Sequence, residues 1–198
     1  MKTTKKVILL AVCALLLVVA TVLGTLAYFT SEDNVLNTFT VGQISITLDE
    51  GKLSSDGKTI DKSAGRVKKN AYNVVPGRTY EKDPTLHVDA SSENAWLFIE
   101  LKNGISNIES DAPGDKNIAA QILDNGWTLL SGTSNVYYRL YNKDDSVYDY
   151  ALFTKFTVDD DMKPSDLAKD AVIEINAYAI QLDGFEDNPS SAWANFAK

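Results

Sequence analysis

The sequence predicts an all-β protein: a jelly-roll or Greek-key β-sandwich with a few short helices, preceded by an N-terminal apolar signal helix. Short runs that alternate polar and apolar residues recur between residues 43 and 181, and this period of two is typical of half-buried strands. Turn dipeptides separate the runs, among them Asp56-Gly57, Asn103-Gly104 and Asp183-Gly184. Helical signals are few. Many short strands divided by turns favour a sandwich of two sheets.

The first 27 residues have the pattern of a secretory signal. Three lysines lie within the first six residues, and Val7–Ala27 then forms a run of 21 residues without a charge. The run ends in small residues, which predicts cleavage between Ala27 and Tyr28. Residues 1–27 are therefore expected to be a signal peptide and residues 28–198 one exported domain. The alternative is an uncut anchor, because about 20 apolar residues span a bilayer. Contact with a membrane is expected only through this uncut segment.

The predicted strands follow one another along the exported domain. They are expected over residues 43–48, 85–88, 96–102, 136–141, 151–158 and 171–181. In residues 96–102 the pattern places Leu97, Ile99 and Leu101 on one face. In the longest run, 171–181, Ile173, Ile175, Ala177 and Ala179 share one face, and Glu174, Asn176 and Tyr178 share the other.

Short helices are predicted at three places. Residues 115–123 fit a helix with Ile118, Ile122 and Leu123 facing inward, and residues 164–167 fit a single turn. Asn188 and Pro189 supply a cap and a first-turn proline for a helix over residues 190–197. Residues 51–70 are polar and aperiodic, so an exposed loop is expected there.

Charge and cysteine content limit the classes of function. The chain carries a formal charge of −8, and removal of the three lysines of the signal leaves −11 on residues 28–198. A domain this acidic is not expected to bind nucleic acid through its overall charge. The single cysteine, Cys13, lies in the apolar run, so the exported domain has no disulfide. Such a domain depends on its core, or on assembly with neighbours.

No pattern in the exported domain predicts catalysis or a cofactor. A zinc protease typically needs about three protein ligands, and the H-E-x-x-H motif is absent. The only histidine, His87, lies in a predicted strand and is interpreted as an ordinary strand residue. The acidic runs Asp159–Asp161, Asp144-Asp145 and Asp183–Asp187 are calcium candidates, but none has EF-hand spacing and solvated loops are the preferred interpretation. We therefore predict no catalytic residue, no bound metal and no cofactor.

Several segments resemble the TasA/camelysin family of exported proteins, which are processed by a SipW-type signal peptidase. The resemblance begins with GTLAYFT at residues 24–30 and NTFTVG at residues 37–42, before an alternating strand. It continues with VPG at 75–77, AWLFI at 95–99 and AYAIQ at 177–181, in the family's order over nearly the whole chain. The resemblance implies a jelly-roll domain that is secreted to the extracellular matrix or cell surface and assembles into biofilm fibres. Some members, the camelysins, are described as metallopeptidases; because the zinc motif is absent, we do not carry this activity over and predict that the protein is not an enzyme.

The resemblance also implies assembly similar to donor-strand exchange, in which the freed N-terminal segment adds to the next subunit. In this chain Phe29, Val35, Phe39 and Val41 have one parity, so an extended segment places them on one face. Strand addition gains main-chain hydrogen bonds, and alternate side chains supply specificity. The expected partners are the signal peptidase and further copies of the chain, with other matrix proteins as additional candidates. Two alternatives stay open: a camelysin-like extracellular metallopeptidase, and a monomeric cell-surface binding module that uses the tyrosines of residues 137–150, which are otherwise expected in cross-strand pairs and the core.

Overall fold

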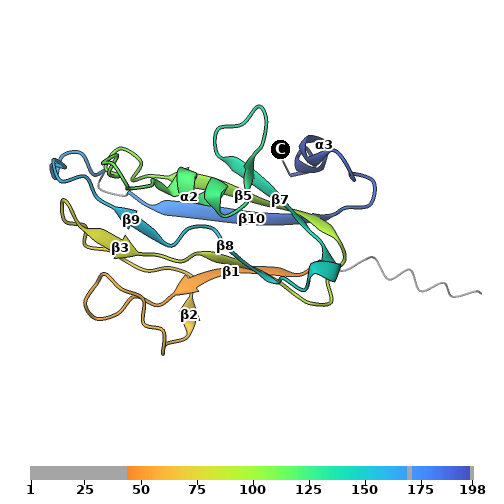
Figure 1. Cartoon of the computed structure of the whole chain (residues 1–198), viewed down its shortest axis with the longest axis horizontal. Helices are drawn as coiled ribbons and strands as arrows, with labels where there is room; N and C mark the ends of the chain where they lie inside the picture. Colours follow the sequence, from red (N-terminus) through yellow and green to blue (C-terminus); the bar gives the residue numbers. More distant parts are fainter. Residues whose placement is uncertain (1–43, 169–170, 197–198) are drawn as a thin grey trace, which may run out of the picture. The chain divides into compact units, whose positions relative to one another are not determined.

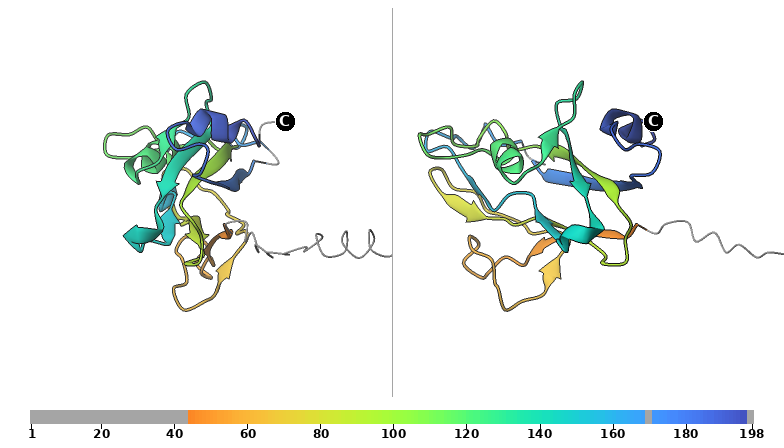
Figure 2. Two further views of the ribbon diagram at one scale, coloured as in Figure 1. Left: turned by 90° about the vertical axis from the view of Figure 1, so that its right-hand side faces the viewer. Right: turned by 45° about the vertical axis from the view of Figure 1, so that its right-hand side comes forward.

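The protein is a two-layered, mostly β structure, as seen in a computed structural model that describes residues 44–168 and 171–196. One sheet has the strand order β2–β1–β4–β8, and a second has the order β10–β5–β7–β6. A small third sheet pairs β3 with β9. The two layers are seen in Figure 1, with β10, β5 and β7 above and β1 and β8 below, and Figure 2 shows the same layers from two further directions. The all-β prediction is confirmed for these residues.

Two strands, β5 and β10, have nine residues each, and the others are shorter. The first sheet contains β1 (Ile46–Gly51), β2 (Arg66–Val67), β4 (Thr85–Val88) and β8 (Asp149–Ala151). The second contains β5 (Ala95–Asn103), β6 (Thr128–Leu129), β7 (Val136–Tyr141) and β10 (Ile173–Gln181), and the third contains β3 (Thr79–Glu81) and β9 (Lys155–Thr157). The helices are α2 (Ile118–Asp124), the 3-10 turn η1 (Lys143–Asp145) and α3 (Pro189–Trp193). Every strand pair among them is antiparallel.

Most strand predictions are confirmed, and one is wrong. The runs at 85–88, 96–102, 136–141 and 171–181 coincide with β4, β5, β7 and β10, and the run that starts at residue 43 is β1, displaced toward the C-terminus. The run 151–158 is not one strand: it is divided between β8 in the first sheet and β9 in the third. The physical reason is the adjacent pair Leu152 and Phe153, which are both fully buried. Two consecutive buried side chains break the period of two that a half-buried strand requires.

The main core lies between the inner faces of the two sheets. Leu86 and Val88 of β4 meet Leu97, Ile99 and Leu101 of β5 in one cluster of buried side chains. The inward parity expected for β5 is therefore confirmed. The tyrosines of residues 137–150 were expected in cross-strand pairs and the core. Tyr137, Tyr141 and Tyr150 are buried in this cluster, and Tyr148 packs against it.

A second, smaller cluster covers the outer face of the second sheet. Trp96 and Phe98 of β5 lie there with Tyr138 and Tyr178, and the C-terminal segment around α3 adds Trp193. The indole N–H of Trp96 donates to the carbonyl of Phe185 at 2.9 Å, which fixes the segment that leads into α3. As predicted, Asn188 caps this helix, which ends at Trp193 and not at residue 197.

The other predicted helices have mixed outcomes. Asn117 caps α2 by accepting from the N–H of Ala120, and Ile118 and Ile122 are buried as expected. Leu123 is 48% exposed, so its predicted inward position is wrong. Residues 164–167 form turns, and residues 51–70 are largely exposed, with the two residues of β2 inside them. The described residues contain no helix long and apolar enough to cross a membrane, and the predicted signal helix lies outside them.

Gly104 follows β5, and its N–H donates to the carbonyl of Val172, just before β10. A substitution at Gly104 tests how closely the two backbones are packed here. A Cβ atom added at this glycine would lie 2.6 Å from the carbonyl oxygen of Val172 and 2.9 Å from its nitrogen, which are backbone atoms. We expect Gly104→Ala to lower the free energy of unfolding by about 1–3 kcal/mol, the usual cost of overpacking. Urea denaturation measures this difference. Gly65→Ala is the control, since no atom lies within 4 Å of its added Cβ, and an equal loss in both variants would contradict the explanation.

Candidate functional site

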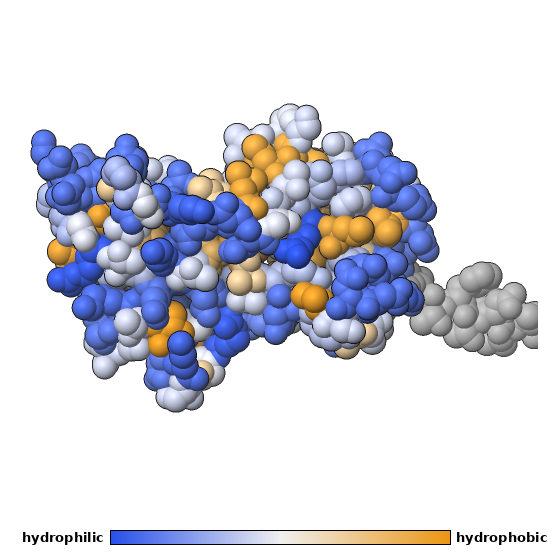
Figure 3. All heavy atoms as spheres, in the orientation of Figure 1, coloured by the Kyte–Doolittle hydropathy of each residue, from blue (hydrophilic) through white to orange (hydrophobic). Residues whose placement is uncertain are grey.

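A groove lies between β1 of the first sheet and β10 of the second sheet, and side chains of both strands line it. It has a volume of about 1180 Å³. Its apolar lining comes mainly from Ile46 and Leu48 of β1 and from Ile173, Ile175 and Ala177 of β10. We call it the β1/β10 groove. Figure 3 shows that hydrophilic side chains predominate on the face drawn there and that hydrophobic ones form small separate patches.

β10 lies at the edge of its sheet for its whole length. Nine residues pair with β5 on one side, and no described strand pairs with the other side. The main-chain bonds from Leu182 N–H to Asn94 and from Gly104 N–H to Val172, both 2.9 Å, place the even-numbered residues in the ladder with β5. Hydrogen-bonding groups alternate in direction along an antiparallel strand. The N–H and C=O groups of Ile173, Ile175, Ala177 and Ala179 therefore point to this open edge.

The inner face of β10 is covered less completely than that of its neighbour. Leu97 and Ile99 of β5 are fully buried, whereas Ala179 and Ala177 opposite them are only partly buried. Ile175 is likewise partly buried against the same core. Apolar side chains at this edge thus remain accessible beside main-chain groups that no described strand pairs. This combination suits the addition of a further strand.

The facing edge of β1 is already partly occupied by the chain that follows it. β2 pairs with Glu50 and Gly51, and the ammonium group of Lys68 donates to the carbonyl of Leu48 at 2.8 Å. The side chain of Asn70 donates to the carbonyl of Gly51, also at 2.8 Å. Because these contacts occupy part of the outer edge of β1 and no described strand pairs with the outer edge of β10, β10 offers the longer pairing surface of the groove.

A buried ion pair closes one end of the groove. Glu50 of β1 and Lys82 both line it, are 4% and 7% exposed, and are joined by a hydrogen bond. The Lys82 ammonium lies 5.6 Å from the centre of the Tyr72 ring. Burial, with the nearby charge of Glu50 and its neighbours, raises the pKa of Tyr72, so its hydroxyl stays protonated and donates to the carbonyl of Glu81. The polar groups at this end are thus paired within the domain.

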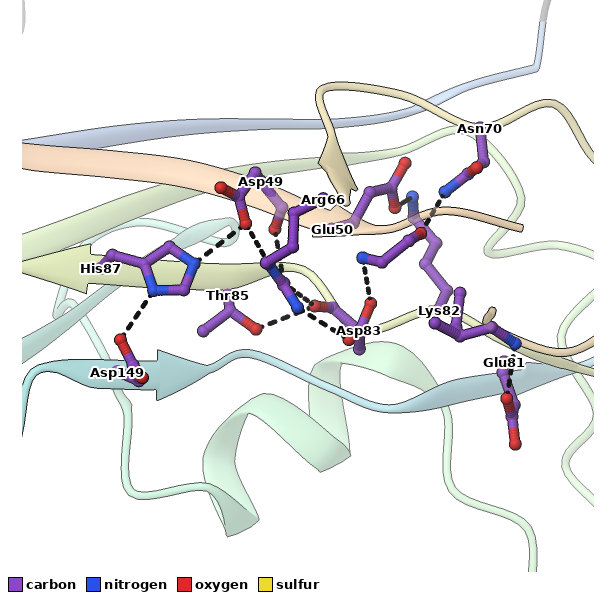
Figure 4. A network of polar contacts seen from close by, with 12 residues as sticks. Asp49, Glu50, Arg66, Asn70, Glu81, Lys82, Asp83, Thr85, His87 and Asp149 are labelled. Carbon is purple, nitrogen blue, oxygen red and sulfur yellow. Dashed lines mark hydrogen bonds and ion pairs between the residues drawn. The ribbon is translucent and has the colours of Figure 1, made fainter. Parts of the chain in front are cut away.

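A second polar network lies on the outer face of the first sheet (Figure 4). Arg66 of β2 contacts the carboxylates of Asp49 and Asp83, and Asp49 also contacts His87 of β4. His87 contacts Asp149 of β8 through its other ring nitrogen. The sequence predicted an ordinary strand histidine, and it gave no sign of these two carboxylates from different strands.

The acidic runs are not assembled into one site. Among the described residues, Asp159, Asp160 and Asp161 form the only group of three or more with ligand atoms close enough for one metal ion. Their side chains are partly or fully exposed, and the carboxylate of Asp159 accepts from the N–H of Asp161 at 2.8 Å. This bond is typical of a turn that the acidic run itself stabilises. The runs at 144–145 and 183–187 belong to separate loops.

The residues predicted for cleavage and assembly lie outside the described part of the chain. This holds for Ala27 and Tyr28 at the expected cut, and for Phe29, Val35, Phe39 and Val41 of the expected assembly strand. The described part of the chain has an open sheet edge at β10, a surface of the kind to which a further strand adds. Comparison with models of protein families, with curated proteins and with solved structures finds no match in any of the three.

Proposed function

We propose that this protein is an exported structural protein of the extracellular matrix that assembles into fibres by strand addition. Residues 28–41 of one copy, freed by a SipW-type signal peptidase that cuts after Ala27, pair with the open edge of β10 in the next copy. The observation that carries the proposal is the edge of β10 along residues 173–179, beside an apolar groove. Other matrix proteins that present an extended apolar segment suit the same edge.

The length and pattern of residues 28–41 match this edge. Fourteen extended residues reach about 46 Å, and the nine residues of β10 need about 30 Å. The four apolar residues Phe29, Val35, Phe39 and Val41 share one face, which suits the apolar floor of the β1/β10 groove. We also infer a jelly-roll connectivity, supported by the way in which strands consecutive in sequence, such as β4 and β5 or β7 and β8, belong to different sheets.

The position of the first described residues supports one direction for the proposed strand. Ser45 accepts from the N–H of Asp89, and Leu182, just after β10, donates to Asn94 of the same loop. The chain therefore enters the domain at the end where β10 finishes. When copies repeat head to tail along the groove, the segment leaving one copy reaches the next at the start of its β10, near Ile173. Residues 28–41 then run antiparallel to β10.

Disulfide trapping tests both the assembly and its direction, because residues 28–198 contain no cysteine. We expect the cleaved chain carrying Thr40→Cys and Glu174→Cys to form a covalent ladder on non-reducing gels after mild oxidation at high salt. The control carries Thr40→Cys and Ile180→Cys, at the far end of β10, and is expected to stay unlinked. Electron microscopy of both variants, beside a chain that lacks residues 28–37, shows whether fibres form.

The outcomes separate the alternatives. If only the variant with Thr40→Cys and Ile180→Cys forms a ladder, the added strand runs parallel to β10 and not antiparallel to it. Strand addition itself would still be supported. A cleaved chain that stays monomeric at high salt, with no ladder from either pair, would overturn the proposal in favour of the monomeric binding module. Casein cleavage that a chelator abolishes would instead favour the camelysin-like metallopeptidase.

A further inference from the structure

His87 is placed at the centre of the first sheet, on the face turned away from the core. Its neighbours in β4, Leu86 and Val88, point inward and are buried, whereas the His87 side chain is 26% exposed. In the register of the sheet it lies opposite Thr47 of β1 on one side and Asp149 of β8 on the other. This single side chain is therefore in reach of both neighbouring strands.

Both ring nitrogens of His87 face a carboxylate. Nε2 lies 2.9 Å from Oδ1 of Asp49, and Nδ1 lies 2.7 Å from Oδ1 of Asp149. An ionised carboxylate only accepts hydrogen bonds, and a neutral imidazole has one N–H to donate. Only the doubly protonated imidazolium makes both bonds at once. The geometry thus fits the cation, and removal of one proton leaves one carboxylate without its donor.

The charged groups around the ring decide which of the two carboxylates loses its hydrogen-bond donor when the imidazolium loses a proton. Asp49 keeps a second cation, Arg66 of β2, which also contacts Asp83 in the segment before β4. Asp149 is 74% exposed and has no other ion pair in the described ranges. The remaining neighbours on this face, Thr47 and Thr85, carry no charge. The contact of His87 with Asp149 is therefore the weaker side of the arrangement.

The pKa of His87 agrees with this geometry. Partial burial acts to lower it, but hydrogen bonds to Asp149 and Asp49 and the charges of both carboxylates outweigh burial and raise the pKa of His87 above 6.5. For Asp49, burial acts to raise the pKa, and the bonds from Arg66 and His87 hold it below its usual value. Asp49 therefore stays ionised throughout the pH range in which the imidazole titrates.

We propose that His87 is a pH-dependent latch: its imidazolium ties β1 and the edge strand β8 to β4, and loss of its proton frees the β8 side. The latch does not depend on the proposed function, since it joins strands within one copy. Because the proton is held more tightly in the folded protein, the stabilisation is complete below pH 6.5. It is lost as the pH rises through the pKa of folded His87. β8 has only three residues and lies at the edge of its sheet, so it is the element that the latch holds.

The single histidine of the chain makes the latch directly measurable. We expect the imidazole ¹⁵N and ¹H signals of the folded protein to titrate with a midpoint above 6.5 and to show two protonated ring nitrogens at pH values below that midpoint. Asp149→Asn is expected to move this midpoint down. Asp145→Asn, which removes the same charge from the preceding turn without touching His87, is expected to move it much less.

Stability supplies the second measurement. The urea midpoint of the protein is expected to fall as the pH rises from 6.5 through the His87 titration, and this fall is expected to be absent in His87→Gln, which cannot change charge. If His87→Gln does not fold, Asp149→Asn replaces it, since residue 149 is largely exposed, and the fall is then expected to be smaller, because His87 keeps only its contact with Asp49. A histidine midpoint at or below 6.5, or one that Asp149→Asn leaves unchanged, would overturn the latch. Neither result bears on assembly, which the disulfide ladder tests separately.

Discussion

The Ala177→Pro variant is expected to fold as the unchanged protein does and yet to form no fibres. The N–H of Ala177 points to the open edge of β10, so its loss breaks no bond in the ladder with β5. Proline is tolerated at edge strands for this reason. An added strand, however, loses a hydrogen bond worth about 0.5–1.5 kcal/mol, and the proline ring occupies the position where that strand must lie.

Sedimentation at high salt measures this effect, because screening reduces the repulsion between chains that each carry a large negative charge. The matched control is Ala177→Val, which keeps the N–H and adds a side chain suited to a strand. Circular dichroism confirms that both variants are folded. Fibres from Ala177→Pro in the amount that the control forms would show that the open edge of β10 is not the pairing surface.

The Lys82→Met variant is expected to be the least stable of the single substitutions discussed. It keeps most of the volume of the side chain but leaves the carboxylate of Glu50, 4% exposed, without its cation. Breaking a buried ion pair by removing one partner typically costs about 3–5 kcal/mol, because a buried charge is left uncompensated. Urea denaturation with intrinsic tryptophan fluorescence measures the loss.

Two further variants show whether the buried charge is the cause. The double variant Glu50→Leu with Lys82→Met removes both charges and is expected to recover most of the lost stability. Lys102→Met breaks an ion pair with Glu174 in which both side chains are about half exposed, and it is expected to leave the urea midpoint nearly unchanged. If the double variant is no more stable than Lys82→Met, the loss comes from packing and not from the unpaired carboxylate.

Local sequence patterns predicted the elements of the fold better than their arrangement. The alternation of polar and apolar residues located β4, β5, β7 and β10. In each of these strands, every second side chain packs in the main core or in the second cluster. The alternation failed at residues 151–158, where Leu152 and Phe153 are buried side by side and the chain moves from one sheet to another. Alternation reports which face of a strand is buried, and it does not report which strands lie beside it.

The candidate site shows the same limit. The pattern of β10 predicted its inward residues, but its place at the edge depends on pairing with β5 alone. The pairing of Glu50 with Lys82 joins residues 32 positions apart, and that of His87 with Asp149 joins residues 62 positions apart. Such contacts are set by the tertiary structure, so no local pattern contains them. The assembly segment 28–41 stays a prediction from its sequence.

The pairing of β5 with β10 has a consequence for the order in which the edge of β10 forms during folding. The paired residues are 70 to 86 positions apart, and β10 is the last strand along the described part of the chain. Contacts between segments so distant in sequence form slowly, since a long loop must close first. Until residues 173–181 pair with β5, the edge of this sheet is β5 itself, and the edge of β10 does not yet exist. The edge to which we propose that a strand adds therefore forms only after the pairing of this sheet that is most distant in sequence is complete.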